Sequence, residues 1–117
     1  MIRAEFVTED NKFIGFSVKG HSGLRPSGED ILCASVSGMA MLVINTLQEV
    51  FKATLSLDIR EEVPLLSADV LSVPSQNEIG AFGTIEGFWL QLSDLEKQYP
   101  GNLTVNVRHS QKGKKND

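Results

Sequence analysis

The longest apolar helical pattern in the chain runs from Asp30 to Lys52, and it limits the possible folds more than any other feature. Apolar residues recur there at intervals of three and four positions, which is typical of an amphipathic helix. A helix with so wide an apolar surface has to be covered on more than one side. We therefore expect it to pack on a sheet, and we consider a second subunit as a further cover. The stripe consists of Ile31, Ala34, Ala40, Met41, Ile44, Leu47 and Phe51, widened by Val36, Met39, Val43 and Val50.

Two alternating segments precede this helix. Residues 2–8 and residues 13–19 alternate between apolar and polar side chains, which predicts a strand in each. A short polar turn joins them, so we expect an antiparallel hairpin. In the second strand the pattern indicates that Ile14, Phe16 and Val18 face the core.

The rest of the chain continues the same mixture of elements. Residues 79–99 have apolar residues at helical spacing, but glycines interrupt the first half, so we expect a solid helix only from Thr84. Three further segments alternate and predict strands, namely residues 55–61, 66–73 and 103–107. The resulting order is ββ-α-ββ-α-β. It predicts an α+β fold in which two helices pack on a mostly antiparallel sheet.

The composition limits the number of domains and the partners. A chain of 117 residues, 41% of them hydrophobic, suits a single domain, which we place at residues 1–109 and follow with a disordered polar tail at 110–117. A single cysteine and an N-terminus without a signal-peptide pattern fit the cytoplasm. No continuous apolar run approaches about 20 residues, so we expect no membrane partner. The net charge of -4 argues against direct nucleic-acid binding.

The residues that could carry chemistry gather between Gly20 and Gly38. Cys33 falls near the start of the predicted helix, where the partial positive charge of the helix N-terminus favours a reactive thiolate. His21 follows a strand in a glycine-flanked turn, from which an exposed imidazole can act as a general base. The alternatives are a cysteine that only packs in the core and an ordinary loop histidine. Taken together, Cys33 and His21 predict nucleophilic catalysis.

Other polar residues have less defined roles. Asp30 either caps the helix or orients the imidazole. Ser37 lies one turn after Cys33 on the same face, and it either bonds the carbonyl one turn back or faces the site. His109 is the alternative general base. One cysteine and two separated histidines offer no metal-binding set, so we expect no metal and no other cofactor. A glycine-rich loop before a helix can also hold an anion, which leaves an anion-binding module as another reading.

Two segments of the chain resemble the signature of the ribosomal-processing cysteine protease family Prp. They are Gly20-His21-Ser22-Gly23 and Gly28-Glu29-Asp30-Ile31-Leu32-Cys33-Ala34-Ser35-Val36-Ser37. The family pattern reads G-H-[AS], a short loop, and then G-x-D-[IV]-[VL]-C-A-[AG]-[VI]-S. Ser35 departs from it, because alanine or glycine is commoner there. The resemblance continues through Asn45 to Tyr99-Pro100, so it covers almost the whole of the ordered chain.

The resemblance implies a small homodimeric endopeptidase of the bacterial cytoplasm. Such enzymes remove a short N-terminal extension from the precursor of a large-subunit ribosomal protein, the twenty-seventh in the usual naming, and cut after adjacent aromatic residues. It further implies that Cys33 is the nucleophile and His21 the general base. The supporting or substrate-contacting positions would be Gly20, Ser22, Asp30 and Ser37. The alternative is a non-catalytic homodimer that binds a ribosomal protein or an assembly factor through the same loop.

Overall fold

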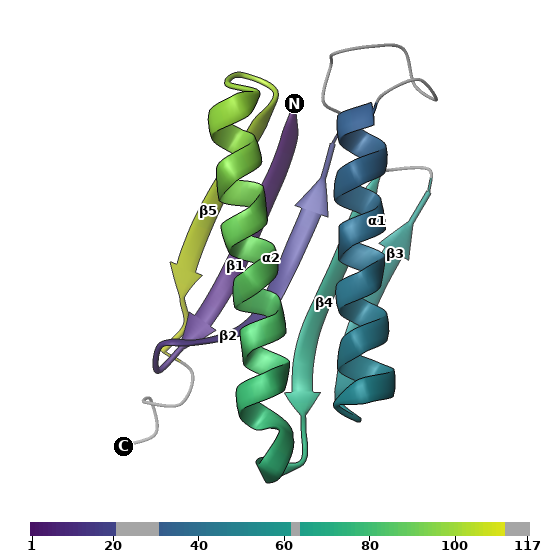
Figure 1. Cartoon of the computed structure of the whole chain (residues 1–117), viewed down its shortest axis with the longest axis vertical. Coiled ribbons are helices and arrows are strands. Elements are labelled where there is room, and N and C mark those ends of the chain that lie inside the picture. Colours follow the sequence, from purple (N-terminus) through teal and green to yellow (C-terminus); the bar gives the residue numbers. More distant parts are fainter. Residues whose placement is uncertain (21–30, 62–63, 112–117) are drawn as a thin grey trace.

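The computed structural model describes residues 1–20, 31–61 and 64–111, and these form two long helices on one face of a five-stranded sheet (Figure 1). The strands are β1 (Ile2–Glu9), β2 (Lys12–Lys19), β3 (Thr54–Arg60), β4 (Leu65–Ser72) and β5 (Leu103–His109). The helices are α1 (Ile31–Asn45), which a π-helical turn continues over Thr46–Val50, and α2 (Glu78–Gln98), which a short 3-10 turn at Ser75–Asn77 precedes. The expected order of elements and the α+β class are both confirmed.

The strands lie in the order β3-β4-β2-β1-β5. Of the four pairings, only that between β1 and β5 is parallel, so the sheet is mostly antiparallel as expected. The hairpin of β1 and β2 is closed by Asp10 and Asn11, whose φ angles of 54° and 66° are those of a type I′ turn. Asp and Asn tolerate this left-handed conformation, which explains why a two-residue link is enough.

The core-facing pattern of β2 differs from the expected one. Val7 pairs with Gly15, but the next residue, Thr8, pairs with Phe13, so the register shifts by one residue within the hairpin. This bulge turns Phe13 and Phe16 toward the core together, and both are buried. The expectation for Ile14 is therefore wrong, since the ring of Phe13 occupies that position in the core. The centroid of this ring lies 5.1 Å from that of Trp89 on α2.

One side of α1 supplies the centre of the core. Leu32, Val36 and Ala40 are among its buried residues, while Ile31 and Leu42 on other sides are 75% and 64% exposed. The helical segment ends at Val50 rather than at the expected Lys52, because Lys52 has a φ of 58° and cannot continue a right-handed helix. Because Ile31 and Leu42 are exposed, the sheet covers the wide apolar stripe of α1 on one side only.

The helical segment Ile31–Val50 is long and apolar enough to cross a membrane by length and composition, with a mean hydropathy of 1.6. The expectation from the sequence concerned a continuous apolar run, and this segment is not one, because polar residues such as Ser35, Asn45 and Gln48 interrupt it. Because its inner side is buried against the sheet, including Val43, Ile44 and Leu47, we describe it as a core helix of the domain. The core helices of globular proteins meet the same criterion.

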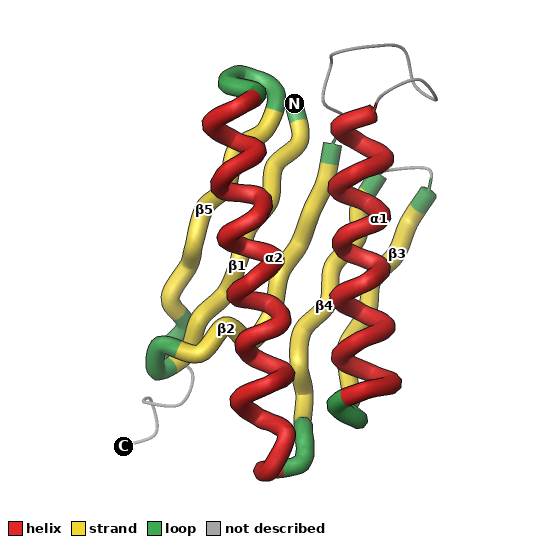
Figure 2. The backbone as a smooth tube through the Cα atoms, in the orientation of Figure 1, coloured by secondary structure: helices red, strands yellow, loops and turns green. Residues whose placement is uncertain are grey.

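Helix α2 is continuous from Glu78, so the expectation that it becomes solid only at Thr84 is wrong. One of the glycines in the first half of α2, Gly80, is explained by packing. A Cβ atom there would overlap the ring of Phe51 at the end of the first helical segment. The amide of Asn77 donates a hydrogen bond of 3.0 Å to the Phe51 carbonyl oxygen and holds that residue in place. The end of the first helical segment and the start of α2 lie at the same end of the sheet (Figure 2), and Gly80 leaves room there for the ring of Phe51.

The glycines of α2 predict opposite effects on stability. Nothing lies within 4 Å of a Cβ atom added at Gly83 or Gly87, so Gly83→Ala and Gly87→Ala should each raise the free energy of unfolding by about 0.5–1 kcal/mol. Gly80→Ala makes the same change in helix propensity but collides with Phe51, and such overpacking costs about 1–3 kcal/mol. We expect a net loss, measured by urea unfolding. A Gly80→Ala variant as stable as the other two would show that the contact is not tight.

Candidate active site

The candidate active site lies at the end of the sheet where β2 ends and α1 begins (Figure 1). Gly20 follows the last residue of β2, and α1 begins at Ile31. Of the six residues predicted from the sequence, the structure describes Gly20, Cys33 and Ser37. His21, Ser22 and Asp30 lie outside the described residues, as does the rest of the segment 21–30.

Gly20 is required by the backbone at this point. Its φ of 96° belongs to a region that favours glycine, and a Cβ atom would collide with the carbonyl oxygen of Met1. Its N–H group donates a hydrogen bond of 3.1 Å to the Pro64 carbonyl oxygen. These contacts fix the direction in which the chain leaves β2, and His21 is the next residue along the chain.

Cys33 and Ser37 come from the first two turns of α1. Cys33 is the third residue of the helix and is half-buried, while Ser37 is exposed. Residues four apart in a helix lie on the same side, one above the other. The next position on that side is Ala40, which is fully buried. A continuous strip of small side chains therefore leads from the thiol along α1.

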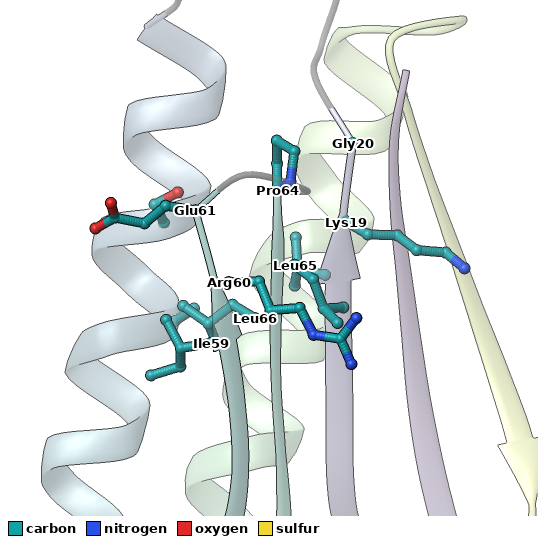
Figure 3. A pocket seen from close by; sticks show the side chains of 11 residues that line it. Lys19, Gly20, Ile59, Arg60, Glu61, Pro64, Leu65 and Leu66 are labelled. Atoms are coloured by element: carbon teal, nitrogen blue, oxygen red, sulfur yellow. The ribbon is translucent and has the colours of Figure 1, made fainter.

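A pocket of about 290 Å³ adjoins this strip. Ser37 and Ala40 line it from α1, and Gly20 lines it from the end of β2. The facing wall comes from the end of β3 and the start of β4, where Ile59 and Leu66 are partners in the sheet (Figure 3). Two of the predicted site positions, Gly20 and Ser37, are thus brought together in one pocket.

Three charged residues, Lys19, Arg60 and Glu61, are among those that line the pocket. Arg60 donates hydrogen bonds of 3.0 Å from Nε and 2.9 Å from Nη2 to the carboxylate oxygens of Asp58. These bonds and the attraction between the two charges raise the pKa of Arg60 above its usual value. Among residues 1–20, 31–61 and 64–111, no cluster of three or more His, Cys, Asp or Glu side chains could hold a metal ion.

His109, the alternative general base, lies at the opposite end of the strands from the candidate site. Strand β5 runs parallel to β1, and β1 runs antiparallel to β2, so the end of β5 is opposite the end of β2 (Figure 1). The imidazole Nδ1 of His109 lies 2.6 Å from Oγ1 of Thr8, in a hydrogen bond between neighbouring strands. This histidine therefore has a structural partner and does not approach Cys33 within one chain.

Residues 1–104 match the sequence profile of a family described as cysteine protease Prp. The chain belongs to the cysteine protease Prp family. The resemblance seen in the motif around Cys33 is therefore confirmed, and the match extends over both helices and into the last strand. A comparison with curated proteins gives no match.

Several solved structures have the same fold as this chain. The Streptococcus mutans protein SMU.848 is 24% identical, with a TM-score of 0.81 over 94% of this chain and 96% of that one. The S. aureus essential ribosomal processing protease Prp with a covalently linked product peptide is 18% identical, with a TM-score of 0.82 over 92% of this chain and 100% of that one. The same protease with a substrate peptide is 17% identical, with a TM-score of 0.78 over the same shares.

Sequence reasoning missed the wall of the pocket that faces α1. Ile59 and Leu66 lie in strands whose alternation predicts only that one side is apolar. Alternation does not tell a residue that points into the core from one that lines an open pocket beyond the core. The distinguishing signal is structural, because Ile59 is on the helix side of an edge strand and is nevertheless 52% exposed.

Proposed function

We propose that this chain is a cysteine endopeptidase that removes the N-terminal extension of a large-subunit ribosomal protein precursor, the twenty-seventh in the usual naming. Membership of the Prp family supports peptidase activity. The S. aureus relative bound to a substrate peptide and to a covalently linked product peptide supports a peptide substrate. The main structural support for the proposal is the position of Cys33, which lies on the side of α1 that leads into a pocket.

The proposed reaction is acyl transfer through a Cys33–His21 dyad. His21 takes the thiol proton, and Sγ of Cys33 attacks the scissile carbonyl carbon. The peptide C–N bond breaks, and His21 gives the proton to the leaving amine. Water then loses a proton to His21 and attacks the thioester, and Sγ leaves with that proton. Gly20 fixes the strand end before His21, while Ser22, Asp30 and Ser37 support the dyad or contact the substrate.

The start of α1 supplies a natural site for the developing oxyanion. The first backbone N–H groups of a helix have no acceptor within the helix and point away from its first turn. Cys33 is in that turn, so these donors lie next to the reacting carbon. A single oxyanion donor typically contributes about 3–4 kcal/mol to transition-state stabilisation.

We propose that the active form is a homodimer in the cytoplasm. Ile31 and Leu42 expose 75% and 64% of their surface on sides of α1 that the sheet does not cover. Gly38, on the same helix, has open space around the position of a Cβ atom, so another chain could approach the helix closely there. Sedimentation equilibrium of the purified chain measures this directly, and a monomer at micromolar concentration would contradict it.

The test of the proposed function is cleavage of the ribosomal protein precursor with its extension. Wild-type protein is mixed with the precursor, and the products are measured by mass spectrometry. We expect a single cut near the N-terminus and no cut in a precursor that lacks the extension. Prior treatment with iodoacetamide should block the reaction, since it alkylates the thiol. Binding of the precursor without cleavage would contradict the peptidase and favour the non-catalytic binding module.

A further inference from the structure

The sheet divides at the end that lies away from the candidate active site. Strands β2 and β4 pair with each other only as far as Gly15 and Asp69. Strand β2 begins earlier, at Lys12, and β4 continues to Ser72, so both extend beyond the last pair. Figure 2 shows the two strands separating toward this end. We call the opening between residues 12–14 of β2 and residues 70–72 of β4 the fork.

The bulge in β2 explains why the fork opens. Ile14 is its extra residue, because the neighbours Phe13 and Gly15 pair with consecutive residues of β1. A bulge bends the strand that contains it and increases its twist, so the β1–β2 hairpin turns away from β4. Strand β4 keeps its pairing with β3 as far as Ser72. Its other edge is therefore open along residues 70–72, where a further extended chain could pair with it.

A cavity of about 750 Å³ occupies the fork. Apolar side chains line it from three elements: Ile14 from β2, Leu71 from β4 and Phe82 from α2. Leu71 is 66% exposed, so the domain itself leaves this part of the lining uncovered. An open strand edge beside exposed apolar side chains is the arrangement through which many proteins bind an extended peptide segment.

The charges around the fork favour a basic segment. Acidic residues outnumber basic ones in its lining, and both basic groups lie near carboxylates. Lys12 Nζ is 3.9 Å from Oε1 of Glu78, and Arg108 Nε is 3.7 Å from Oε1 of Glu5. The remaining negative charge complements Lys or Arg side chains of a partner. The charged residues that line the fork are Glu9, Asp10, Asp69, Glu78, Lys12 and Arg108.

We propose that the fork binds an extended, basic segment of the ribosomal protein precursor that lies after the cleavage site, in the mature part of that protein. The inference rests on the proposed function and adds a second contact with the substrate, far from the reacting bond. Proteins that contact RNA phosphates do so with Lys and Arg, so a ribosomal protein carries the charge that complements the fork.

The distance between the fork and the candidate active site sets the length of substrate required. The two sites lie at opposite ends of β2, whose 8 residues span about 26 Å at about 3.3 Å per residue. An extended substrate needs about eight residues after the cut to cover this distance. A peptide that ends about four residues after the cut therefore reaches the active site but not the fork.

The test compares cleavage of the full precursor with cleavage of such a short peptide. Wild type should show a kcat/KM about tenfold or more higher for the precursor, mainly through KM, because the second contact raises the local concentration of the cleavage site. Leu71→Lys, which places a positive charge in the fork, should remove most of this advantage and leave kcat/KM for the peptide within about threefold of wild type. Val50→Lys is the control, since Val50 is 62% exposed and does not line the fork. It should keep both values.

Binding of the mature ribosomal protein, which lacks the extension and cannot be cut, tests the fork separately from the peptidase. In isothermal titration calorimetry, Leu71→Lys should raise its Kd about tenfold or more, and added salt should raise the Kd of wild type. Asp10→Asn should raise the Kd by a smaller factor. It removes one charge, keeps the left-handed turn that Asn also tolerates, and covers the case in which Leu71→Lys unfolds.

The outcomes separate the fork from the peptidase. If wild type cuts the precursor and the short peptide with the same kcat/KM, or if the variants of the fork bind the mature protein as wild type does, the fork proposal is overturned and the peptidase stands. If the mature protein binds and the variants weaken it, while neither the precursor nor the peptide is cut, the peptidase fails and the fork stands as the contact of a binding module.

Discussion

Cys33→Ala is expected to lower the rate of precursor cleavage by about 10⁴- to 10⁶-fold, which is the scale seen when the nucleophile of a hydrolase is removed. The residue is half-buried in the first turn of α1, so replacing its thiol group by a hydrogen atom should leave the fold intact. Precursor cleavage under excess enzyme, followed over hours by mass spectrometry, has the range to measure this loss.

The matched control is Ser35→Ala, which changes an exposed residue of the same helix that does not line the pocket. It should cleave at the wild-type rate. A Cys33→Ala preparation that keeps more than about 1% of wild-type activity is too active for a chain without its nucleophile. Such a result would require a different nucleophile.

His21→Ala is expected to lower kcat by about 10²- to 10⁴-fold, the usual contribution of a general base. His109→Ala is its control, since the imidazole of His109 is hydrogen-bonded to Thr8 at the opposite end of the strands. We expect His109→Ala to retain wild-type kcat. The measurement is single-turnover cleavage at several pH values, because loss of the base should also remove the lower limb of the pH profile. A large loss of kcat in His109→Ala with none in His21→Ala would reverse the assignment.

The sequence predicts an element of the fold correctly where the spacing of apolar residues fits only one kind of secondary structure. The alternation of residues 2–8 and the apolar stripe of residues 30–52 each correspond to an observed element, because burial of one face imposes that period. The errors at Ile14 and in the first half of α2 arise where long-range packing decides the conformation. A bulge depends on the neighbouring strand, and Gly80 is accounted for only by the ring of Phe51.

The candidate site likewise combines residues that a local motif predicts with residues that only the tertiary structure brings into place. Gly20 and Cys33 are recognisable in the sequence because a short motif contains them, and the structure adds the reason for the glycine, which is its contact with Met1. Ile59 and Leu66 come from another part of the chain and from no motif. Only the sheet register brings them opposite Ala40 on α1. Pockets made between distant segments depend on tertiary structure and so cannot be located from local spacing.

The contact between Met1 and Gly20 bears on how the protein should be produced. Ile2 donates a hydrogen bond of 2.9 Å to the Asn102 carbonyl oxygen, so the first strand is held in place from its first residue. An affinity tag fused ahead of Met1 would emerge beside Gly20, next to the candidate active site, and would compete with a peptide for it. A tag placed after β5, which finishes at the opposite end of the sheet (Figure 1), leaves that site free for activity measurements.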